Sequence, residues 1–112
     1  MDHNGVMYAQ NILSANLAAM PPEEDTPQQS WWEFGYDGVE VGIWECRPGT
    51  IRGPTGDYDE VFVCLSGAAT MTGNDGVRYD LSAGSVLFTP SGFTGRWDVT
   101  DTFRKVYCTV NR

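Results

Sequence analysis

The sequence predicts an all-β fold, an antiparallel sandwich or barrel that follows an N-terminal arm. From Trp31 onward, short segments rich in strand-forming residues alternate with turn signals at intervals of about ten residues. Thirteen glycines serve these turns, where the backbone needs a positive φ or a close approach. The length of 112 residues suits one domain of this class.

Residues 1–30 differ in character from the rest and are predicted to form the arm. A weakly helical stretch, residues 11–20, leads into residues 21–29, where prolines and a run of acidic side chains disfavour regular structure. The apolar side chains of this stretch suit docking on the body or on a second subunit, because the arm has too few partners to fold alone. We therefore divide the chain into an arm, residues 1–30, and a globular domain, residues 31–112.

The strands of the globular domain are predicted in order from the turn signals that end them. Pro-Gly, Ser-Gly, Asp-Gly, Ala-Gly and Pro-Ser-Gly sequences each follow a run rich in β-branched or aromatic residues. Because side chains alternate across a strand, Glu60, Phe62 and Cys64 are expected to share one face. The predicted strands are residues 39–46, 60–65, 68–72, 77–81, 86–89, 95–99 and 103–110.

The charge balance limits the classes of partner. Fifteen acidic and seven basic residues give a net charge of -8, which repels phosphate backbones and anionic lipid headgroups. We therefore expect neither nucleic acid nor a membrane as a partner. The chain has no apolar run of about 18 residues and no secretory leader pattern, so we expect a cytoplasmic location.

The three cysteines, Cys46, Cys64 and Cys108, lie inside apolar or strand-like runs and not at a paired spacing. They are expected to be reduced, buried thiols, because free cysteine behaves as a small hydrophobic residue.

Two motifs at fixed distances carry the most specific signal. Six residues separate Glu60 from Gly67, and five separate Gly84 from the run Pro90-Ser91-Gly92, which Gly95 follows. Together with the turn at 47–49 and the segment 104–107, this frame resembles the small cupins similar to (S)-ureidoglycine aminohydrolase and to the ethanolamine-utilisation cupin. The resemblance covers about residues 38–110. It implies a double-stranded β-helix, a jelly-roll barrel of two antiparallel sheets around one small-molecule pocket, and a homodimer that pairs through its sheets.

The chain departs from the resembling family at the metal ligands. In the metal-dependent members three histidines and a glutamate hold a divalent cation, whereas here only Glu60 remains; residues 54–57 and Gly95 include no histidine. One carboxylate does not hold a transition metal tightly, because such sites need at least three protein ligands. We therefore expect no cofactor and no histidine-ligated metal. The alternative is a weak divalent-cation site of oxygen ligands, in which Asp57 or Asp59 assists Glu60.

Four residues are candidates for acid–base chemistry. Glu60 would act as an acid or base in an apolar barrel; its other reading is a carboxylate locked to a neighbour as scaffold. Tyr58 precedes it by two residues and shares its face. For Lys105 and Tyr107 two readings stay open: periodicity alone turns both to solvent, with Val106 and its apolar neighbours inside, but the resemblance implies that both are pocket residues.

Aromatic side chains are the candidates for the wall of a substrate pocket, and their alternative role is ordinary core packing. Arg47 borders a turn near the expected mouth, where it either binds substrate or is solvated. The predicted substrate-binding residues are Trp44, Phe62, Phe88, Trp97 and Arg47.

The sequence therefore favours a cupin that acts on a small-molecule metabolite, metal-free or only weakly metal-dependent, with Glu60 as acid or base. Isomerase, lyase, cyclase and aminohydrolase reactions stay open, and a ureidoglycine-like substrate follows from the resemblance alone. The alternative is a non-catalytic binding or sensor cupin. A third reading is a structural subunit whose arm contacts a partner.

Overall fold

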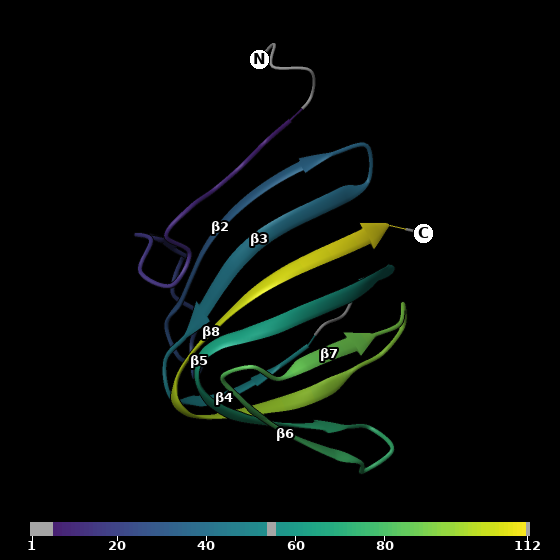
Figure 1. Cartoon of the computed structure of the whole chain (residues 1–112). Helices are drawn as coiled ribbons and strands as arrows, with labels where there is room; N and C mark the ends of the chain where they lie inside the picture. The colour runs from purple at the N-terminus through teal and green to yellow at the C-terminus, as the bar shows by residue number, and fades with distance from the viewer. Residues whose placement is uncertain (1–5, 54–55, 112) are drawn as a thin grey trace.

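The structure, a computed structural model, describes residues 6–53 and 56–111, which contain eight β-strands in antiparallel pairs (Figure 1). The all-β prediction and the double-stranded β-helix are confirmed. The strands are β1 (Ala18–Ala19), β2 (Gln29–Tyr36), β3 (Val39–Cys46), β4 (Gly49–Arg52), β5 (Tyr58–Gly73), β6 (Arg78–Ser82), β7 (Val86–Thr89) and β8 (Gly95–Asn111).

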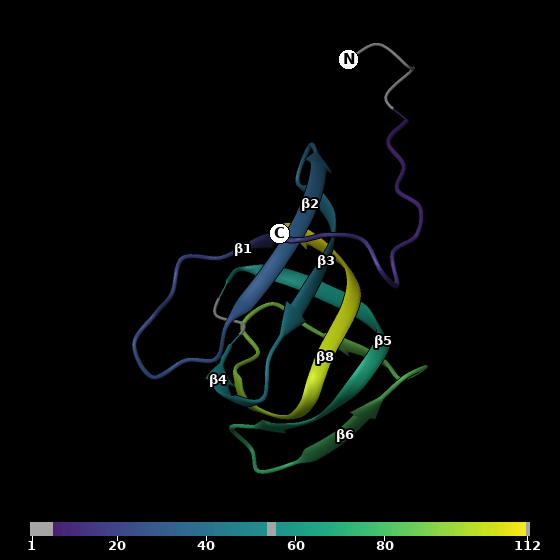
Figure 2. The same ribbon diagram turned by 90° about the vertical axis from the view of Figure 1, so that its left-hand side faces the viewer.

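Two long strands, β5 and β8, run through both layers of the barrel. The first half of β5 pairs with the second half of β8 and with β7, beside β3 and β2. The other halves pair with each other and carry β6 and β4 at their edges. Figures 1 and 2 show β2, β3, β8 and β5 side by side in one curved layer. The sequence predicted each long strand as two separate strands, because turn residues interrupt both runs.

The bend of β5 is made at Gly67, the second fixed residue of the first sequence motif. The register between β5 and β8 shifts between Cys64 and Ala69, which marks a bulge. Gly67 has a φ of 88°, and a Cβ atom there would lie 2.0 Å from the carbonyl oxygen of Thr102. Only glycine fits this close approach of two backbones, so the motif residue is explained by the turn between the layers.

The core lies between the two layers and is dominated by aromatic rings. Trp97 lies at its centre, with ring centroids 5.7 Å from Trp44, 5.5 Å from Phe62 and 5.4 Å from Phe103. Tilted and edge-on packing at these distances is favourable for aromatic pairs. Cys46 and Cys64 are buried free thiols, as predicted, whereas Cys108 is free but only half-buried, on the outer side of β8.

β2 was missed as a strand by the sequence analysis, although its hairpin has a recognisable turn. Asp37 and Gly38 connect β2 to β3 with φ angles of 53° and 83°. Two central residues with positive φ are typical of the tight turn that joins antiparallel strands. The Asp-Gly pair was therefore the signal, and following it would have added this strand to the barrel.

The N-terminal segment docks on the body, but not as a helix. Residues 11–20 were predicted to be weakly helical; instead they form a turn at 12–14 and the short strand β1, which pairs with β2. Arg104 Nη1 donates to the carbonyl oxygens of Ile12 and Ala15 at 2.9 and 3.1 Å. A buried cation thus holds the segment in extended form, and this tertiary contact outweighs the weak helix propensity. The part of the arm before residue 6 lies outside the described residues.

No helix in the described part of the chain has the length and apolar character needed to cross a membrane.

Candidate functional site

A cavity of about 370 Å³ lies between the two layers of the barrel. Strands β2, β3, β4, β5, β7 and β8 contribute side chains to its wall. Most predicted site residues line it: Tyr58, Glu60, Lys105, Tyr107, Trp44, Phe62 and Trp97. For Lys105 and Tyr107 the structure decides between the two readings, because both face the cavity and their neighbours in sequence face outward.

Glu60 and Lys105 form a buried ion pair in the wall of this cavity. Lys105 Nζ lies 2.6 Å from Glu60 Oε2, and the two side chains are 10% and 8% exposed. Opposite charges at this distance attract strongly when water is excluded. This attraction offsets part of the free energy that is lost when both groups are removed from water. The pair therefore places one base and one acid at a single point of the cavity.

Aromatic rings surround the Lys105 ammonium. Its nitrogen lies 4.5 Å from the ring centroid of Phe62, 5.0 Å from Trp44, 5.1 Å from Trp97 and 5.6 Å from Tyr107. The negative faces of such rings attract a cation, which compensates part of the lost hydration. Burial lowers the pKa of Lys105, while the neighbouring Glu60 carboxylate opposes that shift. The ammonium is therefore a stronger acid than an ordinary lysine.

Tyr107 connects the cavity wall to β2. Its hydroxyl donates a 2.5 Å hydrogen bond to Glu33 Oε2. Burial raises the pKa of Tyr107, and the Glu33 carboxylate raises it further. Burial also raises the pKa of Glu33. The hydrogen bond from Tyr107 lowers this pKa in part, and the neighbouring Glu40 raises it further. The tyrosine is therefore a neutral hydrogen-bond donor that orients Glu33.

Tyr58 lies on the same wall, half-buried. Burial raises the pKa of its hydroxyl, and the negative charges of Glu60, Glu40 and Glu33 add to the shift. A phenol with a raised pKa stays protonated and serves as a donor to a bound molecule.

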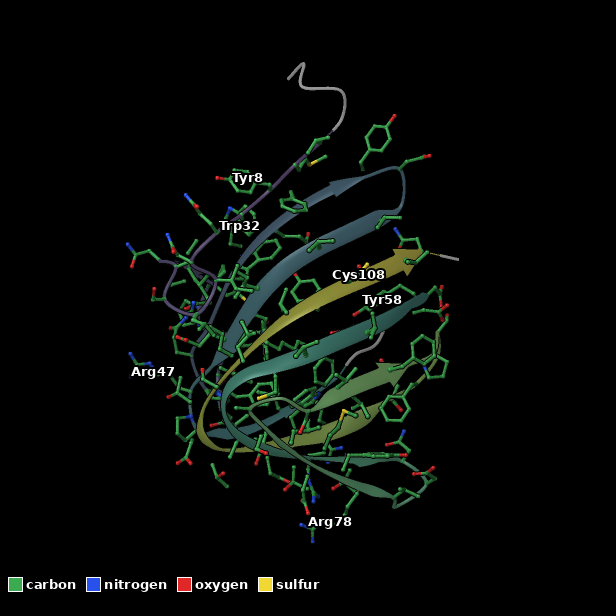
Figure 3. All side chains as sticks on the ribbon, viewed as in Figure 1. Tyr8, Trp32, Arg47, Tyr58, Arg78 and Cys108 are labelled. Carbon is green, nitrogen blue, oxygen red and sulfur yellow. The ribbon has the colours of Figure 1, made fainter. Side chains whose placement is uncertain are left out.

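Two predicted substrate-binding residues do not line the cavity. Phe88 is 56% exposed on the outer side of β7, because Leu87 and Thr89, which alternate with it, face inward. Arg47 is exposed beyond the end of β3 and points away from the barrel (Figure 3). The sequence of β7 does not reveal which face Phe88 occupies, and Arg47 lies in the turn after β3, outside the residues that line the cavity.

The acidic side of the cavity was not predicted from the sequence. Glu33 and Glu40 line it from β2 and β3, together with Gln29 and Trp31. All but Glu40 lie on β2, and the strand's alternation, once recognised, would have placed Trp31 and Glu33 on one face. The signal that would have revealed this strand is again the Asp37-Gly38 turn.

The residues present do not fit the histidine-ligated metal of the family's metal-dependent members. Lys105 Nζ already contacts Glu60, so an intrinsic cation neutralises the remaining carboxylate. A Cβ atom at Gly95 would lie 2.8 Å from the carbonyl oxygen of Thr72, which leaves little room for a ligand side chain there. Within residues 6–53 and 56–111, no three Asp, Glu, Cys or His side chains form a group suited to a metal ion.

The oxygen ligands considered as helpers of Glu60 do not converge on it. Asp59 lies on the opposite face of β5, where its Oδ1 accepts a hydrogen bond from the backbone N–H of Ser91 at 2.9 Å. Asp57 is exposed in the loop before β5. Residues 54 and 55 lie outside the described residues.

Comparison with proteins of known structure supports the fold. The chain is similar to the EutQ protein of Clostridium difficile, with a TM-score of 0.73 at 19% identity over 87% of this chain and 81% of that one. The cupin domain of Schizosaccharomyces pombe Cnp3 gives a TM-score of 0.69 at 17% identity, covering 96% and 74% of the two chains. At these identities the likeness concerns the fold.

A DUF861 family protein from Thermotoga maritima is 31% identical, with a TM-score of 0.55, over 58% of this chain and 73% of that one. A comparison with curated proteins gave no match. The model of the EutQ-like cupin domain matches residues 35–107, which run from the end of β2 into β8 and include both Glu60 and Lys105. The chain therefore belongs to the family of EutQ-like cupin domains.

Proposed function

We propose that the chain binds a small carbonyl metabolite in the barrel and transfers a proton on it with Glu60 and Lys105. The observation that carries this proposal is the 2.6 Å contact between Lys105 Nζ and Glu60 Oε2 in the cavity wall. An acid and a base held side by side suit proton transfer. Apolar surroundings strengthen their interaction with charge that develops in the transition state.

In the proposed step, the Glu60 carboxylate takes a proton from the carbon beside the carbonyl group. The electron pair of that C–H bond moves toward the carbonyl oxygen, where the Lys105 ammonium stabilises the developing negative charge. Return of the proton to a different atom gives an isomer, and loss of a group from the adjacent carbon gives an elimination product. The lowered pKa of Lys105 favours this role, because a stronger acid donates a stronger hydrogen bond to the oxygen.

The remaining cavity residues would orient the metabolite. Trp44, Phe62 and Trp97 supply an apolar wall around the ammonium. Tyr58 lines the same cavity and keeps its proton, so its hydroxyl is suited to hold a polar group of the ligand. The step requires no group other than these side chains.

The test uses deuterium exchange in a panel of small carbonyl metabolites in D₂O, followed by NMR and mass spectrometry. We expect the wild type to incorporate deuterium beside the carbonyl group of at least one compound, and Glu60→Gln to lose this exchange by at least a hundredfold. The matched control is Glu45→Gln. Glu45 is also an ion-paired glutamate, 2.9 Å from Arg104, but it lies outside the cavity. Equal exchange in wild type and Glu60→Gln contradicts the proposal.

A binding or sensor cupin is the second candidate. The observation that favours it is the mutual neutralisation of Glu60 and Lys105 within the ring of aromatic side chains, which suits a fixed scaffold. Thermal-shift measurements on the same panel distinguish the two: a compound that stabilises wild type and Glu60→Gln equally, without exchange, supports binding alone. Ureidoglycine belongs in the panel, with ammonia release as its readout, because the sequence resemblance implies that aminohydrolase reaction.

A further inference from the structure

Glu33 is a second carboxyl group on the wall of the cavity, and the reaction proposed above does not use it. Glu33 lies on β2 and Glu60 on β5, with β3 and β8 between them in the curved sheet (Figure 1). Both side chains line the same cavity. Three strand spacings of about 4.8 Å, roughly 14 Å in all, separate the two backbones across the sheet, and two glutamate side chains that extend into one cavity narrow this gap. A molecule of a few carbon atoms can therefore contact both carboxyl groups.

Gly42 allows Tyr107 to hold Glu33 in a fixed orientation. The register places Gly42 of β3 between Glu33 of β2 and Tyr107 of β8. A Cβ atom at Gly42 would lie 2.5 Å from the Tyr107 hydroxyl oxygen, so the tyrosine crosses β3 at a position without a side chain. The hydroxyl then donates its 2.5 Å hydrogen bond to Glu33 Oε2. A carboxyl group held in this way from a neighbouring strand is preorganised for a chemical role.

The surroundings of Glu33 suit a carboxyl group that holds a proton. Burial raises its pKa, the hydrogen bond from Tyr107 lowers this pKa in part, and the neighbouring Glu40 raises it further. Two carboxyl groups side by side do not both ionise readily, because their negative charges repel each other. The Lys105 ammonium pairs with Glu60. The cavity therefore combines an ion-paired carboxylate on one strand with a proton-bearing carboxyl group on another.

An acid held apart from the base has a specific use in an elimination. In an isomerisation, one base can remove a proton and return the same proton to another atom. In an elimination, a group must leave from the adjacent carbon, and a hydroxyl group leaves readily only if it gains a proton as the C–O bond breaks. The separation of Glu33 from Glu60 therefore favours elimination over isomerisation.

We propose that Glu33 is the acid that protonates the leaving oxygen, so that the reaction in the cavity is the dehydration of a small β-hydroxy ketone. This inference rests on the proton transfer proposed above for Glu60 and Lys105. The Glu60 carboxylate takes the proton from the carbon beside the carbonyl group, and the electron pair of that C–H bond forms the new C=C bond. The C–O bond breaks, and its oxygen takes the Glu33 proton and leaves as water. Transfer of a proton from Glu60 to Glu33 through solvent restores both groups.

The charges on the cavity wall favour an uncharged ketone over a carboxylic acid. Glu40 lies beside Glu33, and its negative charge would repel an anionic group near the leaving oxygen. The Lys105 ammonium is already neutralised by Glu60. Trp44 and Trp97 offer apolar surface to the carbon chain.

The test compares small β-hydroxy ketones with their β-fluoro counterparts, which have nearly the same size and lose fluoride without prior protonation. Ultraviolet absorbance and NMR follow the conjugated ketone that both eliminations produce. We expect the wild type to accelerate both reactions over the spontaneous rate. Glu33→Gln should lose dehydration by at least about a hundredfold but keep fluoride elimination within about threefold of the wild type. The control variant, Glu24→Gln on the exposed arm, should keep both.

An equal loss of both eliminations in Glu33→Gln overturns the inference, because a residue that only supports the fold affects both alike. A wild type that exchanges deuterium but dehydrates no β-hydroxy ketone also overturns it and leaves proton abstraction by Glu60 standing. Absence of exchange in the wild type removes the proposed function, and this inference with it.

A second measurement needs no variant and does not depend on the folding of Glu33→Gln. As the pH rises through the raised pKa of Glu33, the wild type should lose dehydration but not fluoride elimination, because only dehydration uses the Glu33 proton. Titration of Glu60 and Lys105 affects both reactions and cancels in their ratio. A ratio of the two rates that is independent of pH contradicts the assignment of Glu33.

Discussion

Lys105 contacts Glu60 although the two residues are not opposite each other in the sheet. Lys105 is in register with Cys64, four residues farther along β5, and Glu60 is in register with Thr109. The lysine side chain therefore runs along the sheet past Phe62 to reach the carboxylate 2.6 Å away. Its length is essential to the pair, and a shorter side chain at this position would leave Glu60 without its cation.

Removal of Lys105 should destabilise the fold. We expect Lys105→Met to cost about 3–5 kcal/mol, because it leaves the buried Glu60 carboxylate uncompensated. The double variant Lys105→Met with Glu60→Leu should recover most of this loss, since no buried charge then remains. Urea unfolding measures both free energies. A single variant as stable as the wild type would mean that the pair is not buried as described.

Two glycines with the same backbone conformation should respond differently to alanine. Gly67 and Gly92 have φ angles of 88° and 87°, but only at Gly67 would a Cβ atom collide with a backbone, 2.0 Å from the Thr102 carbonyl oxygen. Gly92→Ala should cost about 1–2 kcal/mol from the left-handed conformation alone. Gly67→Ala should cost at least about 2 kcal/mol more, because the layers of the barrel must separate at the bend. Equal thermal unfolding of the two variants would refute this explanation of the motif glycine.

Glu33 should make the stability of the protein depend on pH. Burial raises its pKa from the ordinary value of 4.5, so the folded state holds a proton that the unfolded state has already released. Stability should therefore fall as the pH rises from 4.5 through the raised pKa. In Glu33→Gln this part of the slope should disappear, and stability near pH 7 should not decrease. Unfolding at a series of pH values measures the slope, with Glu24→Gln on the exposed arm as control.

Cys46 should resist alkylation in the folded protein. Burial raises the pKa of its thiol to about 11, so roughly one molecule in a thousand carries the reactive thiolate at pH 8. Cys108 is only half-buried, whereas Cys46 and Cys64 are buried, so Cys108 should react first. Peptide mass spectrometry after a short treatment with iodoacetamide identifies the modified residue. Early modification of Cys46 would show that the core opens more readily than the packing suggests.

The sequence was sufficient for the fold because the turns are encoded locally. Gly67, Gly84 and Gly92 each adopt a positive φ, and the spacing between them sets the lengths of the intervening strands. Strand boundaries were less predictable: β5 continues through the turn residues at 66 and 67, because a bulge lets one strand bend from one layer to the other.

The candidate site was predicted where a side chain is fixed by a strand's register, as for Tyr58, Glu60 and Phe62 on β5. Alternation alone could not orient Lys105, because a charged side chain faces the interior only when an oppositely charged group is there to pair with it. That group, Glu60, lies on another strand. Glu33 was not predicted because its strand, β2, was not predicted. Phe88 was assigned to the pocket because its type suits a pocket wall, but residue type does not reveal which face of β7 it occupies.

The continuity of β5 and β8 through both layers limits how the barrel can move. At the bend the two backbones approach so closely that a Cβ atom at Gly67 would collide with the Thr102 carbonyl oxygen, so two continuous, closely packed strands join the layers there. The β2–β3 hairpin is attached to these two strands along one side only, through the pairing of β3 with β8. Glu33 and Glu40 therefore lie on the part of the cavity wall that β5 and β8 support from one side only.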